Sequence, residues 1–341
     1  MVMLPLYIKY PEWIDPFVIE GLPIRWYAVM YLVAFFIAYV MFRYQAKHDG
    51  MIEINEDDSQ TFFFYAILGL LIGARLFSVL FYSDAAYYLT HPWMIFWPFR
   101  NGQFVGLPGM SYHGGVVGAI AGGFLYTRRH KQTLMSLTDT VVTGIPLGYT
   151  FGRLGNFLNA ELYGRVTEVP WGMVFPTAPG FSTTHEWVRT VADDIGMPYS
   201  IGDVINLPRH PSQLYEALFE GVVLFLILWF IVRPIKKKKA MPDGFVFSFY
   251  LMGYGLFRFF IEYCRQPDEG IGYIIALGRE SNNIALFQSF LNISEGQIFC
   301  FIMVAAGALL LSFLLIRRQK IGDYNRGKGG KPQGKAKGRK A

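Results

Sequence analysis

The sequence is poor in the residue types that build disulfide frameworks and metal centres. It holds two cysteines, Cys264 and Cys300, and both fall at or within apolar segments, so no disulfide framework is expected. Its six histidines show no HExxH motif and no paired spacing of metal ligands. Only 16% of the residues are charged. We therefore expect no metal site and no cofactor.

Targeting signals and repeats are also missing. The first twenty residues have no cationic stretch ahead of an apolar one and contain three prolines, so we expect no cleavable signal peptide. Residues 1–23 are instead predicted to form an amphipathic lead-in on the outward face of the membrane. No internal repeat is visible, which argues against the inverted-repeat architecture of many transporters.

What the chain has in abundance is apolar sequence. It is 53% hydrophobic and 17% aromatic, with a mean hydropathy of +0.30. Most of its apolar segments approach the roughly 20 residues that a spanning helix needs. The third is short and Gly-rich and the fourth carries Asp139 and Pro146, so these two are expected to be broken or tilted. The seven segments are residues 24–41, 61–81, 114–126, 134–151, 214–232, 245–261 and 297–315. We predict an all-α polytopic membrane protein with seven transmembrane helices.

The charge pattern orients these helices. Of the 31 Lys and Arg residues, 20 follow the first, third, fifth and seventh segments. Positive charge favours the cytoplasmic side, so the N-terminus is predicted outside and the C-terminus inside. The long loops 82–112 and 152–213 then face outward, and 152–213 is expected to form a loop subdomain within a helical domain of residues 24–317. Residues 318–341 are predicted to be a disordered basic tail that attracts anionic lipid. Since this tail lacks interleaved aromatics, no nucleic acid is expected as a partner.

One polar run interrupts the apolar sequence. Residues Gly152 to Gly164 read Gly-Arg-Leu-Gly-Asn-Phe-Leu-Asn-Ala-Glu-Leu-Tyr-Gly and directly follow the fourth segment. Because hydrocarbon penalises charges and unpaired amides, such a cluster indicates a functional site.

Other polar side chains lie at a similar predicted depth. Tyr254, Arg258 and Glu262 are spaced by four residues and share one helix face. The predicted topology brings the following residues toward the outer half of the bilayer: His113, Arg153, His210, Tyr254 and Arg258. One polar cavity open to the outer leaflet would gather them.

Several polar residues also have a structural alternative. Arg258 could form a structural ion pair with Glu262, and Tyr27 could belong to the belt of aromatic residues at the membrane interface. Arg75 could bind a partner carboxylate, and Asp139 could neutralise a neighbouring arginine. His210 could serve the turn before Pro211. The arginines nevertheless suit a phosphate, because the planar guanidinium can bond it bidentately. Long apolar surfaces suit acyl tails, so a phospholipid is the expected ligand.

At this point the motifs resemble a known family, the prolipoprotein diacylglyceryl transferases of the bacterial inner membrane. The resemblance extends from residue 20 to about residue 317. It rests on the run 152–164 together with Arg25-Trp26-Tyr27, Gly73-Ala74-Arg75, Met110 to Gly115, Arg209 to Glu216 and Tyr254 to Glu262. One departure is Pro108-Gly109, where the family has a glycine pair.

The resemblance implies a reaction and a set of roles. The diacylglyceryl group of phosphatidylglycerol moves to the lipobox cysteine thiol of a prolipoprotein, and glycerol phosphate leaves. The implied catalytic residues are His113, Arg153, Arg258 and Tyr27. The implied phosphatidylglycerol-binding residues are Arg153, Asn156, Glu161, Gly164, Tyr254 and Arg258. The implied supporting residues are Arg75, Asp139, His210, Glu216 and Glu262. Either His113 or the glycerol of the headgroup accepts the thiol proton first.

Two other function classes fit parts of the sequence. An intramembrane protease would use Ser111 and His113, but no Gly-x-Ser-Gly turn is present. An anion transporter would use the intramembrane arginines, but the polar residues concentrate on one side and no repeat is found.

Overall fold

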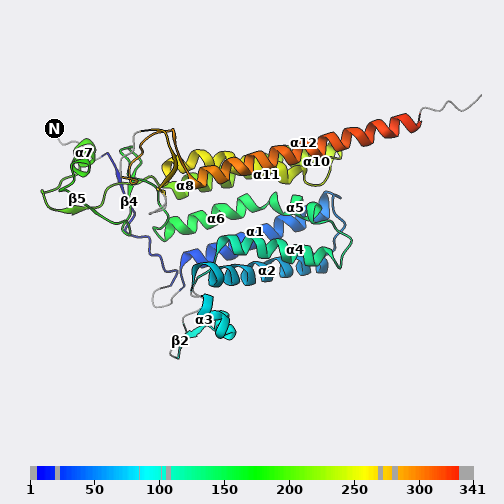
Figure 1. Ribbon diagram of the computed structural model, residues 1–341, viewed down its shortest axis with the longest axis horizontal. Helices are drawn as coiled ribbons and strands as arrows, with labels where there is room; N and C mark the ends of the chain where they lie inside the picture. The colour runs from blue at the N-terminus through cyan, green and yellow to red at the C-terminus, as the bar shows by residue number, and fades with distance from the viewer. Residues whose placement is uncertain are drawn as a thin grey trace, which may run out of the picture. The chain divides into compact units, whose positions relative to one another are not determined.

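The computed structural model describes residues 6–19, 24–83, 85–100, 102–104, 109–267, 272–278 and 283–329. The chain divides into two compact units. Unit 1 comprises residues 1–38 and 142–341, and unit 2 comprises residues 39–141. Figure 1 shows the chain and labels many of its helices and strands.

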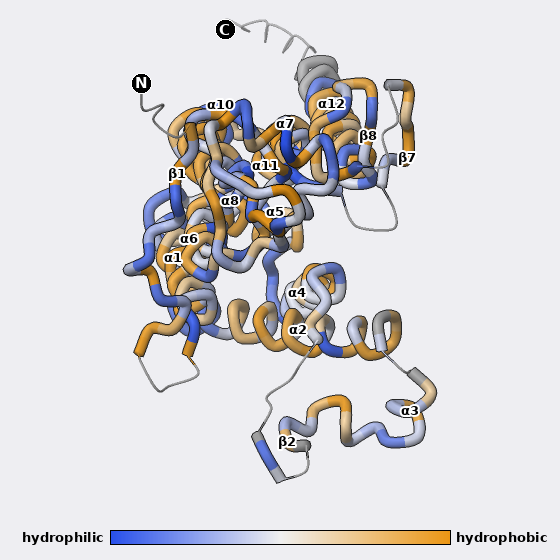
Figure 2. The backbone as a smooth tube through the Cα atoms, turned by 90° about the vertical axis from the view of Figure 1, so that its left-hand side faces the viewer, coloured by the Kyte–Doolittle hydropathy of each residue, from blue (hydrophilic) through white to orange (hydrophobic). Residues whose placement is uncertain are grey.

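Five helical segments of the described residues are long and apolar enough to cross a membrane. They are Trp26–His48, Glu56–Phe81, Ser212–Lys239, Phe245–Cys264 and Glu295–Lys320. They coincide with the first, second, fifth, sixth and seventh segments predicted from the sequence. In Figure 2 most of α2 (Glu56–Tyr82) carries the hydrophobic colour. The chain is therefore a multi-pass membrane protein.

The third and fourth predicted spans are short helices. α4 (Tyr112–Thr127) has 16 residues, fewer than the about 20 that cross a bilayer without tilt. The fourth segment is broken into α5 (Leu134–Val142) and α6 (Ile145–Leu158). Pro146 lies in the first turn of α6, where its missing N–H costs nothing, and Gly144 is the N-cap. The predicted break is thus present, whereas seven complete spans remain a prediction.

Unit 2 is built on close packing between α2 and α4. A Cβ on Gly118 would lie 2.0 Å from the carbonyl oxygen of Gly69, and one on Gly73 would lie 2.3 Å from that of Gly114. Small residues spaced by four allow two membrane helices to touch through their backbones. An aromatic cluster around Phe42 includes Phe62 of α2 and Tyr126 of α4. Its short elements are α3 (Ala85–Thr90), η1 (Pro92–Ile95), β2 (Phe99–Arg100) and β3 (Gln103–Phe104).

In unit 1 the long helices pack side by side (Figure 1). α11 (Phe245–Ile261) lies along α12 (Glu295–Gly329), and α6 lies along the fifth span. The fifth span alternates between α-helical and π-helical stretches. It consists of α8 (Ser212–Glu216), the π-helix η2 (Ala217–Val223), α9 (Leu224–Ile227), the π-helix η3 (Leu228–Val232) and α10 (Arg233–Lys239). A Cβ on Gly221 of η2 would lie 2.1 Å from Oγ1 of Thr150, so α6 contacts this span closely.

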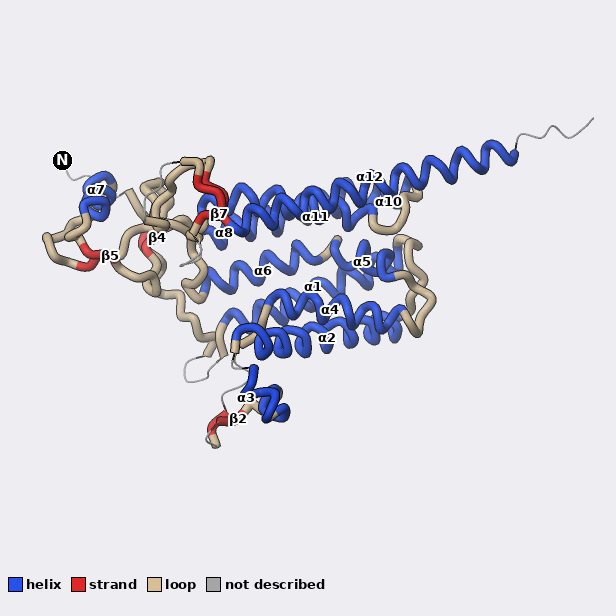
Figure 3. Tube along the Cα trace, in the orientation of Figure 1, coloured by secondary structure: helices blue, strands red, loops and turns tan. Residues whose placement is uncertain are grey.

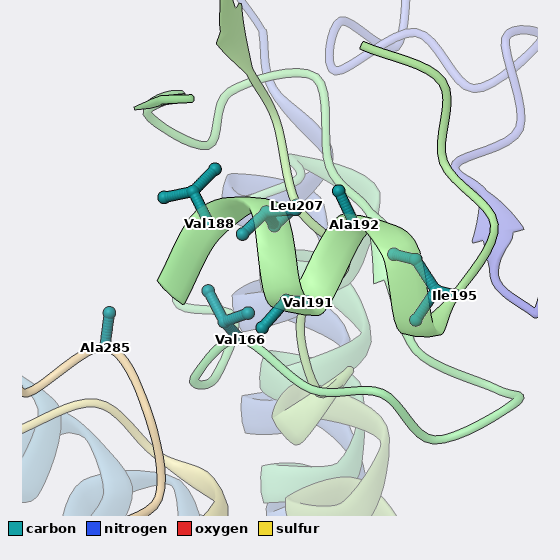
Figure 4. Close-up of a cluster of buried hydrophobic side chains, with 7 residues drawn as sticks. All are labelled: Val166, Val188, Val191, Ala192, Ile195, Leu207 and Ala285. Carbon is teal, nitrogen blue, oxygen red and sulfur yellow. The ribbon is translucent and has the colours of Figure 1, made fainter. Parts of the chain in front are cut away.

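Residues 159–211, between α6 and α8, consist of short strands, loops and one short helix (Figure 3). We call this region, together with the strand β1 that pairs with it, the head. β1 (Ile8–Lys9) pairs in parallel with β4 (Met173–Val174), and β5 (Phe181–Ser182) pairs antiparallel with β6 (Val204–Ile205). Apolar side chains of α7 (Glu186–Asp194) and of the segments packed against it form the core of the head (Figure 4). They are Val166, Val188, Val191, Ala192, Ile195, Leu207 and Ala285. β7 (Tyr273–Ala276) and β8 (Asn292–Ser294) form a further pair, and the short 3-10 helix η4 (Glu262–Cys264) follows α11.

The two ends of the chain are partly described by the structure. Residues 6–10 contact later parts of the chain, because β1 pairs with β4 and the buried Tyr10 donates its hydroxyl to the carbonyl of Phe157 at 2.9 Å, while the amphipathic lead-in of residues 1–23 stays a prediction. α12 continues to Gly329, so the backbone of 318–329 is helical where disorder is predicted. Residues 317–321 are Arg, Arg, Gln, Lys and Ile, which tolerate a helix, whereas 322–329 include three glycines, which favour it little. Residues 330–341 lie outside the described residues.

Candidate active site

The polar run 152–164 forms the end of α6 and the loop that leaves it. Arg153 and Asn156 lie three residues apart on this helix, and NH1 of Arg153 is 3.4 Å from Oδ1 of Asn156. The buried Asn156 in turn donates through Nδ2 to Oε1 of Glu161 at 3.0 Å. Asn156 therefore connects the Glu161 carboxylate with the Arg153 guanidinium.

The backbone on both sides of Glu161 is strained. Ala160 has φ 52° and Leu162 has φ 58°, values in the left-handed region that residues other than glycine seldom adopt. Gln213 donates to the carbonyl of Glu161 at 2.7 Å and Ser212 donates to that of Leu162 at 3.2 Å. These bonds from the start of α8 hold the strained loop in place. Strain of this kind gathers at functional sites.

Glu216 is the centre of a charged cluster. Its side chain is fully buried, and its Oε2 lies 2.6 Å from Nε of Arg153. Its Oε1 lies 3.2 Å from NH1 of Arg258 and 2.8 Å from NH1 of Arg265. A carboxylate in this position would be unstable without partners. The three arginines supply them, and they come from α6, α11 and the turn after η4.

Two further carboxylates complete the cluster. Oε2 of Glu262 lies 3.0 Å from NH2 of Arg258, and Oε1 of Glu220 lies 3.9 Å from NH1 of the same arginine. Three arginines thus face three glutamates. The arginine side chains retain 16 to 21% of their exposure, whereas Glu216 and Glu220 have none. The carboxylates lie beneath the guanidinium groups, so an anion that approaches this cluster meets cations first.

Gly164 ends the run at a crowded position. Its N–H donates to the carbonyl of His210 at 2.8 Å. A Cβ there would lie 2.1 Å from the carbonyl oxygen of Cys264, which only glycine avoids. His210 lies just before α8, and burial, helped by nearby Arg165, lowers its pKa to about 4. Its ring is therefore neutral near pH 7, with Nδ1 at 3.3 Å from the hydroxyl of Tyr215.

Two predicted tyrosines lie near this cluster. Tyr27 is in the first turn of α1 (Trp26–His48), where its partly exposed hydroxyl donates to that of Tyr31 at 2.9 Å. A Cβ on Gly155 would come within 3.3 Å of Cα of Tyr27, so α1 and α6 approach closely. Tyr254 on α11 packs edge-on against Tyr149, with 5.9 Å between ring centroids.

Three predicted site residues belong to unit 2. Arg75 is buried, donates through Nε to the carbonyl of Ile95 at 2.5 Å and lies over the ring of Tyr88. His113 lies exposed in the first turn of α4, after the N-cap Ser111. Asp139 is buried on α5. The other ten predicted residues, all of unit 1, are Tyr27, Arg153, Asn156, Glu161, Gly164, His210, Glu216, Tyr254, Arg258 and Glu262.

Sequence reasoning did not assign three members of the cluster. Arg265 follows Glu262 by three residues. Glu220 lies four residues after Glu216, and Tyr149 lies four residues before Arg153. Both spacings put the side chains on one helix face, so this signal was available in the sequence. Within the described part of the chain, no group of three or more His, Cys, Asp and Glu side chains is arranged to hold a metal ion.

Known proteins are similar in sequence to this chain over nearly its whole length. Residues 16–313 match the family described as prolipoprotein diacylglyceryl transferase. A phosphatidylglycerol–prolipoprotein diacylglyceryl transferase of Treponema pallidum (strain Nichols) is 48% identical, over 89% of this chain and 93% of the relative. The enzyme of the same name from Treponema denticola is 48% identical over 93% of this chain and 97% of its own. A third, from Borrelia garinii subsp. bavariensis, is 43% identical over 90% and 93%. The chain belongs to the prolipoprotein diacylglyceryl transferase family.

Proposed function

We propose that this protein transfers the diacylglyceryl group of phosphatidylglycerol to the lipobox cysteine of prolipoproteins, the first step of bacterial lipoprotein maturation. Family membership supports the reaction, and the cluster of Arg153, Arg258 and Glu216 supports its chemistry. The enzyme works in the bacterial inner membrane with seven spans, the N-terminus in the periplasm and the C-terminus in the cytoplasm. Membrane lipids surround it and supply the donor.

The reaction is a substitution at carbon. The cysteine sulfur forms a bond with the glycerol carbon of the lipid that carries the phosphate ester, and the C–O bond to phosphate breaks. The bonding electron pair leaves with glycerol phosphate, and the thiol proton passes to a base. Since a free thiol has a pKa of about 8.5, the base must assist at neutral pH. The products are a thioether-linked prolipoprotein and glycerol phosphate.

Arg153 and Arg258 are the residues we assign to the phosphate. Their guanidinium groups are partly exposed above buried carboxylates, which fixes their direction before the lipid arrives. Donors that are aimed in advance at developing negative charge lower the barrier, and loss of one such donor typically costs about 100- to 1000-fold in rate. Glu216 and Glu262 hold the two arginines, and Arg265 shares the same carboxylates.

Binding of the glycerol headgroup is assigned to the polar run and the nearby tyrosines. Asn156 and Tyr27 orient the headgroup, Glu161 holds Asn156, and Gly164 lets the loop close against the residues after α11. Tyr254 lines the same side of α11 as Arg258. Arg75, Asp139 and His210 are supporting residues in this proposal.

His113 is proposed as the base that accepts the thiol proton. Histidine suits this role because its ordinary pKa lies close to neutral pH. The alternative acceptor is the headgroup glycerol. Replacement of His113 by Gln separates the two, because transfer that survives at the wild-type rate assigns the proton to the lipid.

One assay tests the function as a whole. Purified protein is incubated with phosphatidylglycerol and a lipobox peptide, and mass spectrometry follows the peptide. We expect the mass of one diacylglyceryl group to be added, and no addition to a peptide with Ser in place of Cys. Absence of any addition by folded protein would contradict the proposal and favour transport of an anionic solute.

A further inference from the structure

The two arginines are joined by a second route besides Glu216. The hydroxyl of Tyr149 accepts a hydrogen bond from Nε of Arg153 at 2.7 Å and donates one to Oε2 of Glu220 at 2.6 Å. The other oxygen of Glu220 lies 3.9 Å from NH1 of Arg258. Together with the contacts of Glu216 to both arginines, these contacts close a ring of five side chains.

The ring is well suited to fix the two guanidinium groups. Glu220 is fully buried and Arg153 also lies over the Tyr149 ring, 4.8 Å from its centroid. Tyr149 comes from α6, Glu220 from η2 and Arg258 from α11, so the ring joins three helices. Glu220 lies within η2, the first π-helical stretch of its span, and such stretches often accompany functional sites. The Tyr149 hydroxyl therefore links the Arg153 guanidinium to the Glu220 carboxylate.

We propose that Tyr149 and Glu220 are positioning residues that set the direction of Arg153, and through it the geometry in which both arginines meet the phosphate. This inference rests on the proposed function of the arginines. Neither residue touches the reacting atoms in this account. They act because Nε of Arg153 is shared between the Tyr149 hydroxyl and Glu216, which limits rotation of the guanidinium.

Removal of the phenol oxygen has a defined consequence. In Tyr149→Phe the ring remains but Arg153 loses one acceptor and Glu220 loses its O–H donor. Hydrogen bonds to charged groups contribute about 1.5 to 3 kcal/mol, which corresponds to about 10- to 100-fold in rate. We expect the loss in kcat for diacylglyceryl transfer and in the affinity for glycerol phosphate, the product that carries the phosphate. The KM for the lipobox peptide should stay within about twofold, since the thiol contacts neither residue.

The test compares Tyr149→Phe, Glu220→Gln and the double variant with wild type. The matched control is Tyr199→Phe, which removes a similar bond from a tyrosine hydroxyl to a carboxylate, Asp193, at 3.3 Å in the head. Each variant is assayed for kcat, for the KM of the peptide, for inhibition by glycerol phosphate and for thermal unfolding in detergent. Wild-type activity tests the proposed function, and only the variants test the positioning role.

The outcomes separate cleanly. Loss of about tenfold or more in kcat, weaker inhibition by glycerol phosphate, and a double variant no worse than the poorer single variant would support the role, because both residues act in one chain of contacts. Multiplied losses in the double variant would overturn it. The role would also be overturned if the KM for the peptide worsened as much as inhibition by glycerol phosphate. The same holds if Tyr149→Phe and Tyr199→Phe had equal kcat. If Glu220→Gln does not fold, Tyr149→Phe with the inhibition assay decides alone.

Discussion

The carboxylate of Glu216 lies 2.6 Å from Nε of Arg153 and has no solvent exposure. Its second oxygen contacts Arg258 and Arg265, so a single buried acid joins α6 to α11 and to the turn beyond it. An active site in a membrane needs its cations held before the lipid enters, because water is scarce there. In the proposed function Glu216 provides this support, and it leaves the partly exposed guanidinium groups of Arg153 and Arg258 available to the substrate.

Loss of the Glu216 charge should damage both stability and catalysis. In Glu216→Gln, three arginines lose a shared partner, and breaking a buried ion pair typically costs about 3 to 5 kcal/mol. We expect a lower melting temperature in detergent and transfer activity reduced by about 100-fold or more. The exposed Glu186→Gln in α7 is the control and should behave as wild type. A Glu216→Gln enzyme with normal activity would contradict the supporting role.

The two glycines that bound the polar run should respond differently to alanine. Gly164→Ala places a Cβ 2.1 Å from the carbonyl of Cys264, and such overpacking costs about 1 to 3 kcal/mol. We expect lower stability and lower activity, because the loop that carries Glu161 must shift. Gly152→Ala meets no atom within 4 Å and lies inside a helix, where alanine is favourable. Equal effects of the two substitutions, measured by thermal unfolding and transfer assay, would refute this explanation.

His210 should make the stability of the folded protein depend on pH. Burial lowers its pKa to about 4 in the folded protein, below the ordinary value of 6.5. Between these values the unfolded chain binds the proton more readily, so this contribution is complete above about pH 6.5 and is lost as the pH falls towards 4. We expect up to about 2 kcal/mol lost at about pH 5. Melting of wild type and His210→Gln at about pH 7.5 and pH 5 measures the difference. Equal losses in both proteins would exclude the histidine as the cause.

The contact between α2 and α4 predicts a sharp dependence on residue size. Gly118→Ala puts a Cβ 2.0 Å from the carbonyl oxygen of Gly69, so the helices must separate. Gly115→Ala in the same helix makes only ordinary contacts, the nearest at 3.5 Å from Leu70. We expect Gly118→Ala to lower the melting temperature clearly and Gly115→Ala to change it little. Comparable melting of the two variants would show that α2 and α4 do not depend on this approach.

The sequence was sufficient for the class of the protein and for its family. Apolar length predicted the five long helices, Pro146 predicted the break between α5 and α6, and the motifs predicted the family, which the relatives confirm. These features depend on local composition and spacing. The site roles assigned to Arg153, Asn156 and His113 stay predictions.

Other features depend on contacts between distant segments. β1 pairs with β4 through Ile8 and Met173, which are more than 160 residues apart, and the sequence of residues 6–10 does not indicate this pairing. The strained φ angles at Ala160 and Leu162 arise from bonds to α8, not from glycine or asparagine at those positions. Glu220 and Tyr149 carried a helical spacing signal, but only the fold brings them to the same arginines.

The central claim is that Arg153 and Arg258 stabilise the phosphate that leaves. The most direct measurement is diacylglyceryl transfer to a lipobox peptide, followed by mass spectrometry, for wild type, Arg153→Ala and Arg258→Ala, with folding of each checked by thermal unfolding. The account predicts transfer by wild type and a loss of at least about 100-fold in both variants. Transfer that survives both substitutions would contradict it and would move phosphate stabilisation to other residues.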